Sequence, residues 1–429
     1  MLVSVATIGS VTDRLFPRRA LEASNTSLGA FRALVIQGAR QVGKSTLAEL
    51  LGRDLGASFV TLDREEDLGA ALDDPTFFLE SLGTPSVIDE VQRGGERMIL
   101  ALKQRLDRDR SPGQYILTGS SNFLTTPVIS ESLAGRVDLL TLWPLSMGEL
   151  GDGRDDFVDR AFTKLAQLEE HDGASFTRSD YVAMVCRGGY PEVQHFAGRA
   201  RQRWFERYVE TVLRREVESA SDLRRFGALQ AMARLLLAQT GSELVISQLA
   251  SNLGIDRATA DTYEPWIETT FLVHRLPAWS RNVTAKIVHR PKLHACDTGL
   301  AAAIMGKDES ALARPNDPMR GPLFESFVVA ELAKQLTWST VSARLHHFRD
   351  RDGLEVDAIV EASDGRVLAI EVKASRVPRA EDAAPMMSLR DKLDRVGGDF
   401  VAGVVFHTGD RRVRLSDRIV GLPIADLWT

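Results

Sequence analysis

A glycine-rich segment that ends in a lysine and a serine has the residue types needed to bind phosphate. Residues 38–45 read Gly-Ala-Arg-Gln-Val-Gly-Lys-Ser and fit G-x-x-x-x-G-K-[ST] at every defined position. The glycines let backbone N–H groups face phosphate oxygens, Lys44 would neutralise the β and γ phosphates, and Ser45 would ligate Mg²⁺. An apolar strand before the segment and a helical run after it disfavour a chance glycine turn. The predicted ATP contacts are Gly38, Ala39, Arg40, Gln41, Val42, Gly43, Lys44, Ser45 and Thr46.

Two acids follow the next apolar strand and could complete this site. Residues 86–90 read Ser-Val-Ile-Asp-Glu. An acid at the carboxyl end of a neighbouring strand can hold Mg²⁺ through an outer-shell water, which is the role predicted for Asp89. Glu90 is placed to polarise the attacking water. Alone, such a pair is usually an ordinary exit from a strand, but its position after the glycine-rich segment favours the catalytic interpretation.

Two further candidates follow along the same part of the chain. Ser120, Ser121 and Asn122 come after the strand-like run that begins at Tyr115, and each is a candidate sensor of the γ-phosphate. We include Ser120 among the predicted nucleotide contacts. A simple polar turn is an equal alternative. Arg136 precedes another predicted strand and is a candidate arginine finger for its own or a neighbouring site, although a solvated structural arginine is the commoner case.

A second set of chemically competent residues lies near the C-terminus. Asp357 sits in one strand-like run, and Glu371 and Lys373 share one face of the next run, after a turn at 364–365. The set resembles the PD-(D/E)xK nuclease core of restriction enzymes and Holliday-junction resolvases. That resemblance implies that Asp357 and Glu371 hold Mg²⁺, that Lys373 steadies the attacking water, and that Glu325 is the additional acid from a preceding helix. Cross-strand Glu–Lys pairs that merely stabilise a sheet are the alternative, and a nuclease fold does not establish cleavage.

The elements that must position these residues can be read from hydrophobic patterning. Short apolar runs alternate with helical stretches from residue 33 to 142, which predicts a parallel α/β sheet. Residues 151–180 are rich in Asp, Gly and Glu and are interpreted as a linker or flexible insertion. A second group of strands is expected between residues 346 and 406. The predicted domains are a P-loop domain (1–150), a linker and helical lid (151–225), a winged-helix-like segment (226–295) and a nuclease-like α/β domain (296–429).

The winged-helix interpretation rests on a helix, glycine turn, helix pattern. Residues 246–255 and 256–267 form the two predicted helices, with Ser247 and Asp256 as N-caps, and 271–277 and 286–293 are the expected wing strands. The second helix carries four acidic or helix-breaking residues for few basic ones. We therefore favour a structural or protein-contacting role over a reader of the DNA major groove.

Several of these motifs together resemble a bacterial and archaeal family of AAA-type ATPases. Its members pair an N-terminal ATPase domain with a C-terminal domain that looks nuclease-like. The resemblance extends over nearly the whole chain and implies ATP binding and ATP hydrolysis with Mg²⁺. It rests on residues 38–46, 88–93, 117–121, 133–136, 143–146, 188–192, 297–300, 321–328 and 348–375.

Composition sets limits on the location and the partners. The 429 residues carry a formal charge of −6, so a chain coated in basic surface is excluded, although one basic groove is not. No apolar run approaches the length of a membrane helix, and the two cysteines have no metal-ligand spacing, so we expect a cytoplasmic protein. The expected function is an ATPase whose nucleotide state controls the C-terminal domain, with DNA as a candidate substrate. The alternative is a nucleotide-dependent switch, as a homo-oligomer or with a protein partner, whose C-terminal domain is inactive.

Overall fold

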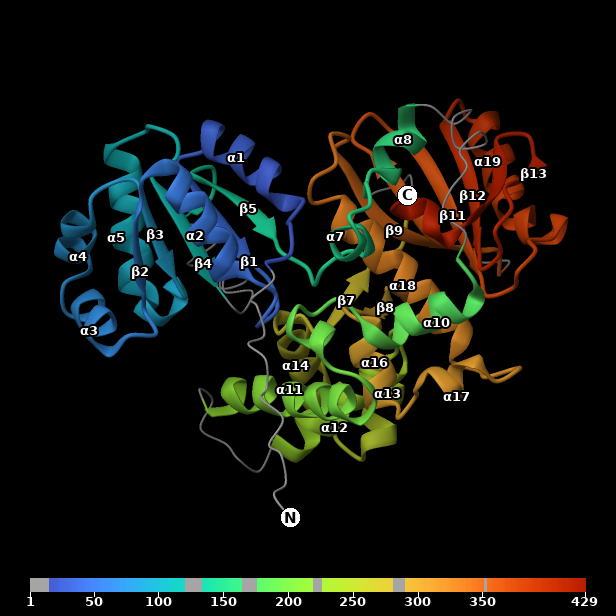
Figure 1. Cartoon of the computed structure of the whole chain (residues 1–429), viewed down its shortest axis with the longest axis horizontal. Helices are drawn as coiled ribbons and strands as arrows, with labels where there is room; N and C mark the ends of the chain where they lie inside the picture. The colour runs from blue at the N-terminus through green and yellow to red at the C-terminus, as the bar shows by residue number, and fades with distance from the viewer. Residues whose placement is uncertain (1–14, 120–132, 164–175, 219–225, 281–289, 351–352) are drawn as a thin grey trace, which may run out of the picture.

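The computed structural model describes residues 15–119, 133–163, 176–218, 226–280, 290–350 and 353–429. Two β-sheets lie on opposite sides of the molecule, and a mainly helical part lies below and between them (Figure 1). None of the helices in these ranges has the length and apolar character needed to cross a membrane.

The first sheet is fully parallel, as the alternating pattern predicted. Its order is β2-β3-β4-β1-β5, so the first strand lies near the middle. Every residue of β1 is buried because helices cover both faces. Ile36 packs toward α1 and α2, and Val35 packs toward α3, α4 and α5. The bounds are β1 Ala33–Gln37, β2 Ser58–Thr61, β3 Ser86–Asp89, β4 Tyr115–Gly119, β5 Val137–Thr141, α1 Ala20–Ala30, α2 Lys44–Leu55, α3 Glu65–Asp73, α4 Pro75–Leu82 and α5 Gly95–Arg108.

The middle part combines helices with a small antiparallel sheet. Three helices and three strands follow one another in the order α12, β6, α13, α14, β7 and β8. In the sheet the strand order is β6-β8-β7. Asp256 caps α14 as predicted, but α13 begins at Ile246, so the expected cap at Ser247 is wrong. Residues 281–289, which include the first half of the expected wing strand 286–293, lie outside the described part. The bounds are α10 Arg178–Arg187, α11 Gly198–Glu218, α12 Phe226–Ala238, β6 Ser242–Glu243, α13 Ile246–Leu253, α14 Arg257–Thr269, β7 Val273–Leu276, β8 Lys292–Ala295, α16 Thr298–Ile304 and α17 Glu309–Ala313.

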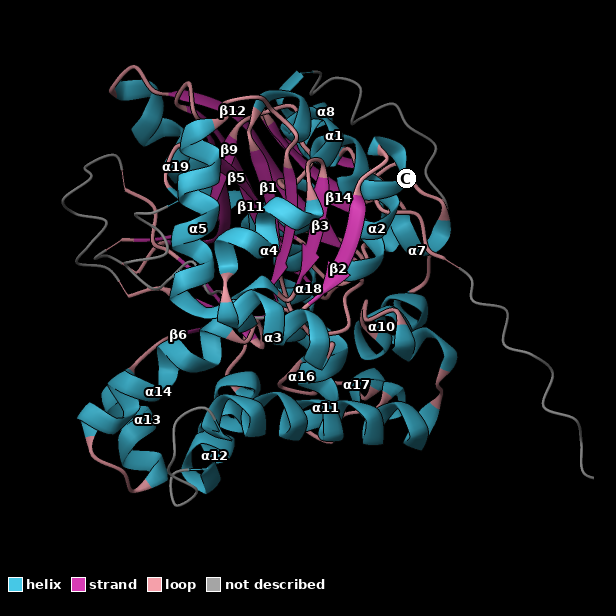
Figure 2. Cartoon of the chain, turned by 90° about the vertical axis from the view of Figure 1, so that its left-hand side faces the viewer, coloured by secondary structure: helices cyan, strands magenta, loops and turns pink. Residues whose placement is uncertain are grey.

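The C-terminal sheet has six strands in the order β13-β14-β12-β11-β10-β9. Strand β10 is antiparallel to both of its neighbours, β9 and β11, whereas β11, β12 and β14 are parallel. Helix α18 packs on one face, and α19 packs on the other through Met386 and Leu389. Figure 2 shows the two sheets and their covering helices from the side. The bounds are α18 Arg320–Gln335, β9 Ala343–Arg349, β10 Glu355–Ala362, β11 Arg366–Lys373, α19 Ala384–Arg395, β12 Asp399–His407, β13 Val413–Ser416 and β14 Ile419–Pro423.

The stretch interpreted as a linker is partly a packed helix. Helix α7 (Met147–Gly151) precedes it and α8 (Phe157–Thr163) lies within it, while residues 164–175 lie outside the described part. Phe157 is fully buried and meets Phe406 of β12 with ring centroids 5.1 Å apart. At least one of the acidic residues that suggested a flexible segment makes tertiary contacts, since Asp159 accepts hydrogen bonds from Ser339 and Thr340. A linker over this described part is therefore wrong.

Candidate functional site

The glycine-rich loop is held in the shape that phosphate binding requires. It connects β1 to α2, and Gly43 at the start of that helix has φ +96°. Gly38 has φ +148°, and a Cβ there would lie 2.1 Å from the carbonyl oxygen of Leu142. Side chains are excluded at both positions, for backbone strain at one and for close approach at the other. The N-terminus of α2 therefore faces the cavity in front of the loop.

Lys44 is a buried cation that is held by its own loop. Its side chain donates to the carbonyl oxygens of Gly38 at 3.0 Å and Ala39 at 2.7 Å. Burial lowers the pKa of Lys44 to about 8, even though the charges of Glu90 and Asp89 act in the opposite direction. A polyphosphate at the loop would stabilise the charged form of this ammonium group and raise the pKa of Lys44 again.

Asp89 ends β3 and joins the loop to the sheet through hydrogen bonds. Its Oδ1 accepts from Ser45 Oγ at 2.7 Å and from Thr118 Oγ1 at 2.5 Å, and its Oδ2 accepts from Thr61 Oγ1 at 3.1 Å. The backbone N–H of Glu90 donates to the same Thr118 hydroxyl at 3.0 Å. The ends of β2, β3 and β4 thus converge on one carboxylate. The hydroxyl and carboxylate oxygens of Ser45 and Asp89 form a hard donor set that suits Mg²⁺.

A cavity of about 670 Å³ opens in front of this group. Its walls include Lys44, Ser45 and Glu90 on one side and Trp204 and Tyr208 of α11 on the other. The structure therefore brings the predicted residues of the first site together. A second cavity of about 570 Å³ lies beside it, and the two share Gly43, Thr46, Pro191 and Glu192 as lining residues.

Three contacts around the loop were not predicted. Tyr208 Oη donates to the carbonyl oxygen of Arg40 at 3.1 Å, and its ring stacks on Trp204 with centroids 5.1 Å apart. Arg18 donates to the carbonyl oxygen of Val42 at 2.6 Å. These residues lie far from the loop in sequence, and helical periodicity marks Tyr208 only as a core position. Thr118, which binds Asp89, was also not predicted as a site residue. Its position at the polar end of a predicted strand is a signal that could have identified it.

The two remaining candidates of the first domain have different outcomes. Ser120 lies outside the described residues. Arg136 pairs with Asp107 of α5 through Nε at 2.6 Å and Nη2 at 3.0 Å. It precedes β5, whose first residue Val137 pairs with Ala33, so it lies at the edge of the sheet opposite the glycine-rich loop. An arginine finger for the site of its own chain is therefore wrong, and a role at a neighbouring chain stays a prediction.

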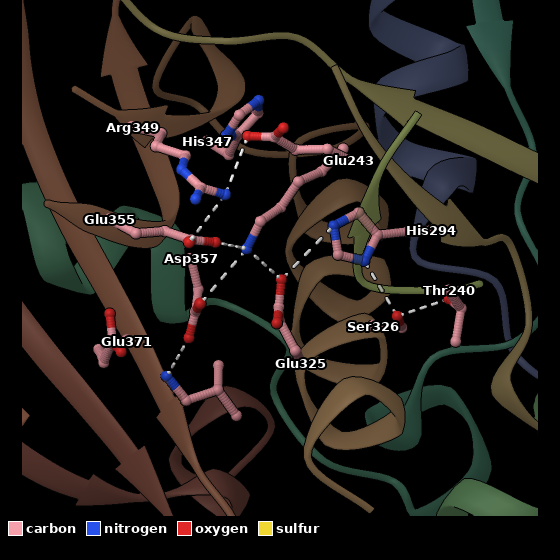
Figure 3. Close-up of polar contacts among 12 residues, drawn as sticks. Thr240, Glu243, His294, Glu325, Ser326, His347, Arg349, Glu355, Asp357 and Glu371 are labelled. Atoms are coloured by element: carbon pink, nitrogen blue, oxygen red, sulfur yellow. Dashed lines mark hydrogen bonds and ion pairs between the residues drawn. The ribbon is translucent and has the colours of Figure 1, made fainter. Parts of the chain in front are cut away.

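The second predicted site is assembled from three elements. Asp357 of β10, Glu371 of β11 and Glu325 of α18 lie near one another (Figure 3), and Lys373 is also on β11. Asp357 Oδ2 accepts the N–H of Val372 at 2.9 Å, and Lys373 donates to Glu371 Oε1 at 2.7 Å. Burial and the Asp357 charge raise the pKa of Glu371 to about 8 and that of Glu325 also to about 8.

A lysine that was not predicted occupies this acidic group. Lys292 of β8 lies 2.9 Å from Glu325 Oε1, 2.5 Å from Glu355 Oε1 and 3.5 Å from Asp357 Oδ1. Burial alone would lower the pKa of Lys292, but Glu325 and Asp357 raise it above its usual value. The sequence holds no local signal for this contact, because Lys292 is more than 30 residues from each of its partners.

The metal site predicted from Asp357, Glu371 and Glu325 is not formed in this arrangement. Among the described residues no group of three or more His, Cys, Asp or Glu is placed to hold a metal ion. The physical reason is that the Lys292 ammonium already neutralises carboxylates that were assigned to the metal. Mg²⁺ therefore does not fit this group of residues as it is folded.

Comparison with known proteins agrees with the geometry of the first site. Residues 30–151 match a family model described as an AAA domain. Residues 178–311 match a domain of unknown function (DUF8612), and residues 320–427 match another (DUF4143). With the parallel sheet and the loop geometry, the first match defines an AAA-type P-loop ATPase domain at the N-terminus.

Two similar proteins align with most of this chain. Uncharacterized proteins of Mycobacterium tuberculosis and Mycobacterium bovis are each 27% identical over 401 residues, which cover 92% of this chain and 81% of each relative. Among solved structures, a Walker-type ATPase of Pyrococcus abyssi has 14% identity and a TM-score of 0.41, covering 68% of this chain and 96% of that one. The RuvB Holliday junction branch migration motor of Thermotoga maritima has 20% identity and a TM-score of 0.28, covering 60% and 86%.

Proposed function

We propose that the protein is a Mg²⁺-dependent ATPase whose nucleotide state controls the arrangement of its C-terminal domain. The observation that carries this proposal is that the P-loop and helix α11 line one cavity and are joined by the Tyr208–Arg40 hydrogen bond. A nucleotide in this cavity would contact both the ATPase domain and the helical part. Its binding energy can therefore favour one arrangement of these two parts over another.

Each residue of the first site has a defined task in this proposal. The loop amides and Lys44 bind the phosphates, and Ser45 and Asp89 hold Mg²⁺. The metal ion would neutralise charge on the β and γ phosphates. Glu90 lines the cavity next to Lys44 and orients the attacking water as a general base. Thr118 keeps Asp89 and the backbone of Glu90 at fixed positions through its hydroxyl.

A chain of buried contacts leads from this cavity toward the C-terminal sheet. Pro191 and Glu192 line the cavity, and Gly189 just before them donates its N–H to Asp297 Oδ2 at 2.6 Å. Asp297 also caps α16 and follows β8 by two residues. Movement of the cavity wall would therefore be transmitted to β8 through a short, buried hydrogen bond.

The proposal is tested by separating binding, hydrolysis and coupling in three proteins. Wild type should hydrolyse ATP with Mg²⁺, Lys44→Ala should lose nucleotide binding, and Glu90→Gln should bind ATP while hydrolysing it about 100-fold more slowly. ATP should then change the limited-proteolysis pattern of residues 320–427 in wild type and Glu90→Gln, but not in Lys44→Ala. Hydrolysis without any nucleotide effect on the C-terminal domain would contradict the coupling.

For the C-terminal domain, we infer a nuclease-like fold. The succession of α18, three antiparallel strands, α19 and a parallel strand supports this assignment, because it carries Asp357 on β10 and Glu371 with Lys373 on β11. The succession α12, β6, α13, α14, β7 and β8, with the strand order β6-β8-β7, likewise supports a winged-helix assignment for the middle part. DNA is the proposed substrate class. Cleavage of linear, single-stranded and branched DNA by wild type, and its loss in Glu371→Ala, would establish the activity.

One observation favours a second candidate function. Lys292 neutralises the acids that a nuclease would use, as expected for a nucleotide-dependent switch with an inactive C-terminal domain. In that case ATP hydrolysis would be intact, no DNA would be cleaved under any nucleotide condition, and Lys44→Ala would lose the binding of a protein partner or a second copy of the chain.

A further inference from the structure

The carboxylates of the C-terminal domain are organised around a cation that comes from another sheet. Lys292 is 3% exposed and belongs to β8 of the small middle sheet, whereas its partners belong to α18 and β10. Figure 3 shows Glu325, Glu355 and Asp357 directed toward a common point. An ammonium group there carries one positive charge and has three donors, so it can serve three carboxylates at once.

The same group of residues contains an acceptor that Lys292 does not satisfy. Glu371 is 6% exposed, its Oε1 accepts from Lys373, and its Oε2 is buried without a hydrogen-bond partner among the described residues. A buried carboxylate oxygen left without a donor is costly, and the cost is commonly offset by a ligand or by a function. Glu371 Oε2 is therefore an oxygen atom that a bound cation could use as a ligand.

Charge balance points in the same direction. Glu325, Glu355, Asp357 and Glu371 are close enough to influence one another's ionisation, and Lys292 and Lys373 are the two ammonium groups in contact with them. Arg349 is a third cation, 3.6 Å from Glu355, but it also serves Glu243 of β6 at 3.1 Å. Because the raised pKa values keep Glu325 and Glu371 protonated near neutral pH, the group has no excess of negative charge while Lys292 is present, and removal of Lys292 would create one. Oxygen-rich sites with such an excess bind hard divalent cations.

We propose that Lys292 is an internal substitute for a divalent cation, and that it keeps a latent Mg²⁺ or Mn²⁺ site in the C-terminal domain closed. Removing its ammonium group opens the site to one divalent ion, held by Asp357, Glu371 and Glu325. The inference deepens the proposed function, because it names the step at which the C-terminal site is regulated. It also accounts for the disagreement between the predicted metal ligands and the observed arrangement.

Lys292 belongs to a different sheet from the carboxylates, so the closure of the metal site can be reversed. It lies on β8, so a shift between the small sheet and the C-terminal sheet would separate it from the acids. The contacts between the two sheets include a single parallel bridge between Ala278 and His347, a contact of the His347 ring with the carbonyl oxygen of Arg290 at 3.0 Å, and the Arg349–Glu243 ion pair at 3.1 Å. The strand that carries Lys292 ends two residues before Asp297, which holds the wall of the nucleotide cavity through Gly189.

The test is a direct count of bound Mn²⁺ in the full-length protein without nucleotide, from the electron paramagnetic resonance signal of free Mn²⁺. Wild type and Lys292→Met share the same P-loop, so a difference between them reports the C-terminal site. Lys292→Met should bind one more Mn²⁺ per chain than wild type, at least tenfold more tightly than any second ion in wild type. The added ion should be lost in Lys292→Met/Glu371→Gln.

A charge-balanced variant keeps the test decisive if Lys292→Met folds poorly. Lys292→Met/Glu355→Gln removes one charge of each sign and leaves all three proposed ligands in place, so it should fold and bind the additional Mn²⁺. Equal Mn²⁺ numbers and affinities in wild type and this variant would overturn the proposal and leave Lys292 as a structural ion pair. Because the count needs neither ATP hydrolysis nor DNA cleavage, failure of the proposed function would show separately in the activity assays.

Discussion

Asp155 offers a sharp test of how the ATPase domain is attached to the C-terminal domain. It is 1% exposed, accepts from Ser146 Oγ at 2.6 Å and from the N–H of Gly148 at 3.1 Å, and lies beside α7. The buried carboxylate of Glu331 on α18 accepts the N–H of Met147 at 3.0 Å in the same junction. Burial and the Glu331 charge raise the pKa of Asp155 to about 7.

The direction of the pH dependence follows from the pKa of Asp155 in the unfolded and folded states. In the unfolded chain Asp155 has a pKa of 3.8, so between about pH 4 and pH 7 the folded state holds a proton that the unfolded state has released. The contribution of Asp155 to stability therefore falls as the pH rises through this window and is constant above it. A difference of roughly three pKa units corresponds to at most about 4 kcal/mol.

Asp155→Asn should remove this dependence. Asparagine copies the neutral acid at every pH, and it tolerates the left-handed conformation of this residue, φ +54°. The variant should match wild type at pH 4 and exceed its stability by up to about 4 kcal/mol at pH 8. The measurement is the urea midpoint of both proteins at several pH values from 4 to 8. Asp156→Asn is the matched control, because Asp156 only pairs with Arg160 near the surface. Parallel pH curves for wild type and Asp155→Asn would refute the reasoning.

Three further predictions concern the nucleotide site. With a pKa of about 8, Lys44 should take up about half a proton when nucleotide binds at pH 8, and the affinity for nucleotide should fall about tenfold from pH 7 to pH 9. Calorimetry in buffers of different ionisation enthalpy would measure the proton uptake. Binding without proton uptake at pH 8 would contradict the prediction. Gly38→Ala should weaken ATP binding more than tenfold in a fluorescent-nucleotide titration, because its Cβ would meet Leu142, whereas Gly69→Ala on α3 has open space and should bind normally. Tyr208→Phe should keep ATP hydrolysis but reduce the effect of ATP on C-terminal proteolysis, and an unchanged effect would remove Tyr208 from the coupling path.

The first site could be predicted because its chemistry is local. A single segment supplies the loop amides, Lys44 and Ser45, and the remaining acid follows the nearest strand in space, whose apolar pattern marks it clearly. The five strands of the first sheet and four strands of the C-terminal sheet, β9 to β12, were predicted within three residues at their ends, since each carries its own hydrophobic pattern. The strands β13 and β14 were not predicted. The order β6-β8-β7 of the small middle sheet depends on strand pairing, which no local pattern contains.

The second site could not be predicted fully because its electrostatics are not local. The spacing of Glu371 and Lys373 on one strand indicates that they share a face, and the structure confirms that Lys373 contacts Glu371. Nothing in the sequence around Lys292 distinguishes it from a surface lysine in a basic stretch, yet folding buries it among acids of two other elements. Arg136 is the opposite case: its position in the sequence suggests a catalytic role, but in the structure its side chain pairs with Asp107.

The two buried lysines that bear on function relate to their ligands in opposite ways. Lys44 is held by carbonyl oxygens of its own loop, which are neutral acceptors, so a polyphosphate competes for it with a stronger charge-assisted bond. Lys292 is held by carboxylates, so a ligand that is itself a cation must displace it and recover the same electrostatic energy. ATP can therefore bind at the first site by rearranging a side chain, whereas a divalent ion can enter the second only after β8 has moved. If binding at the first site supplies that movement through Gly189 and Asp297, the order of events is fixed: nucleotide first, metal second.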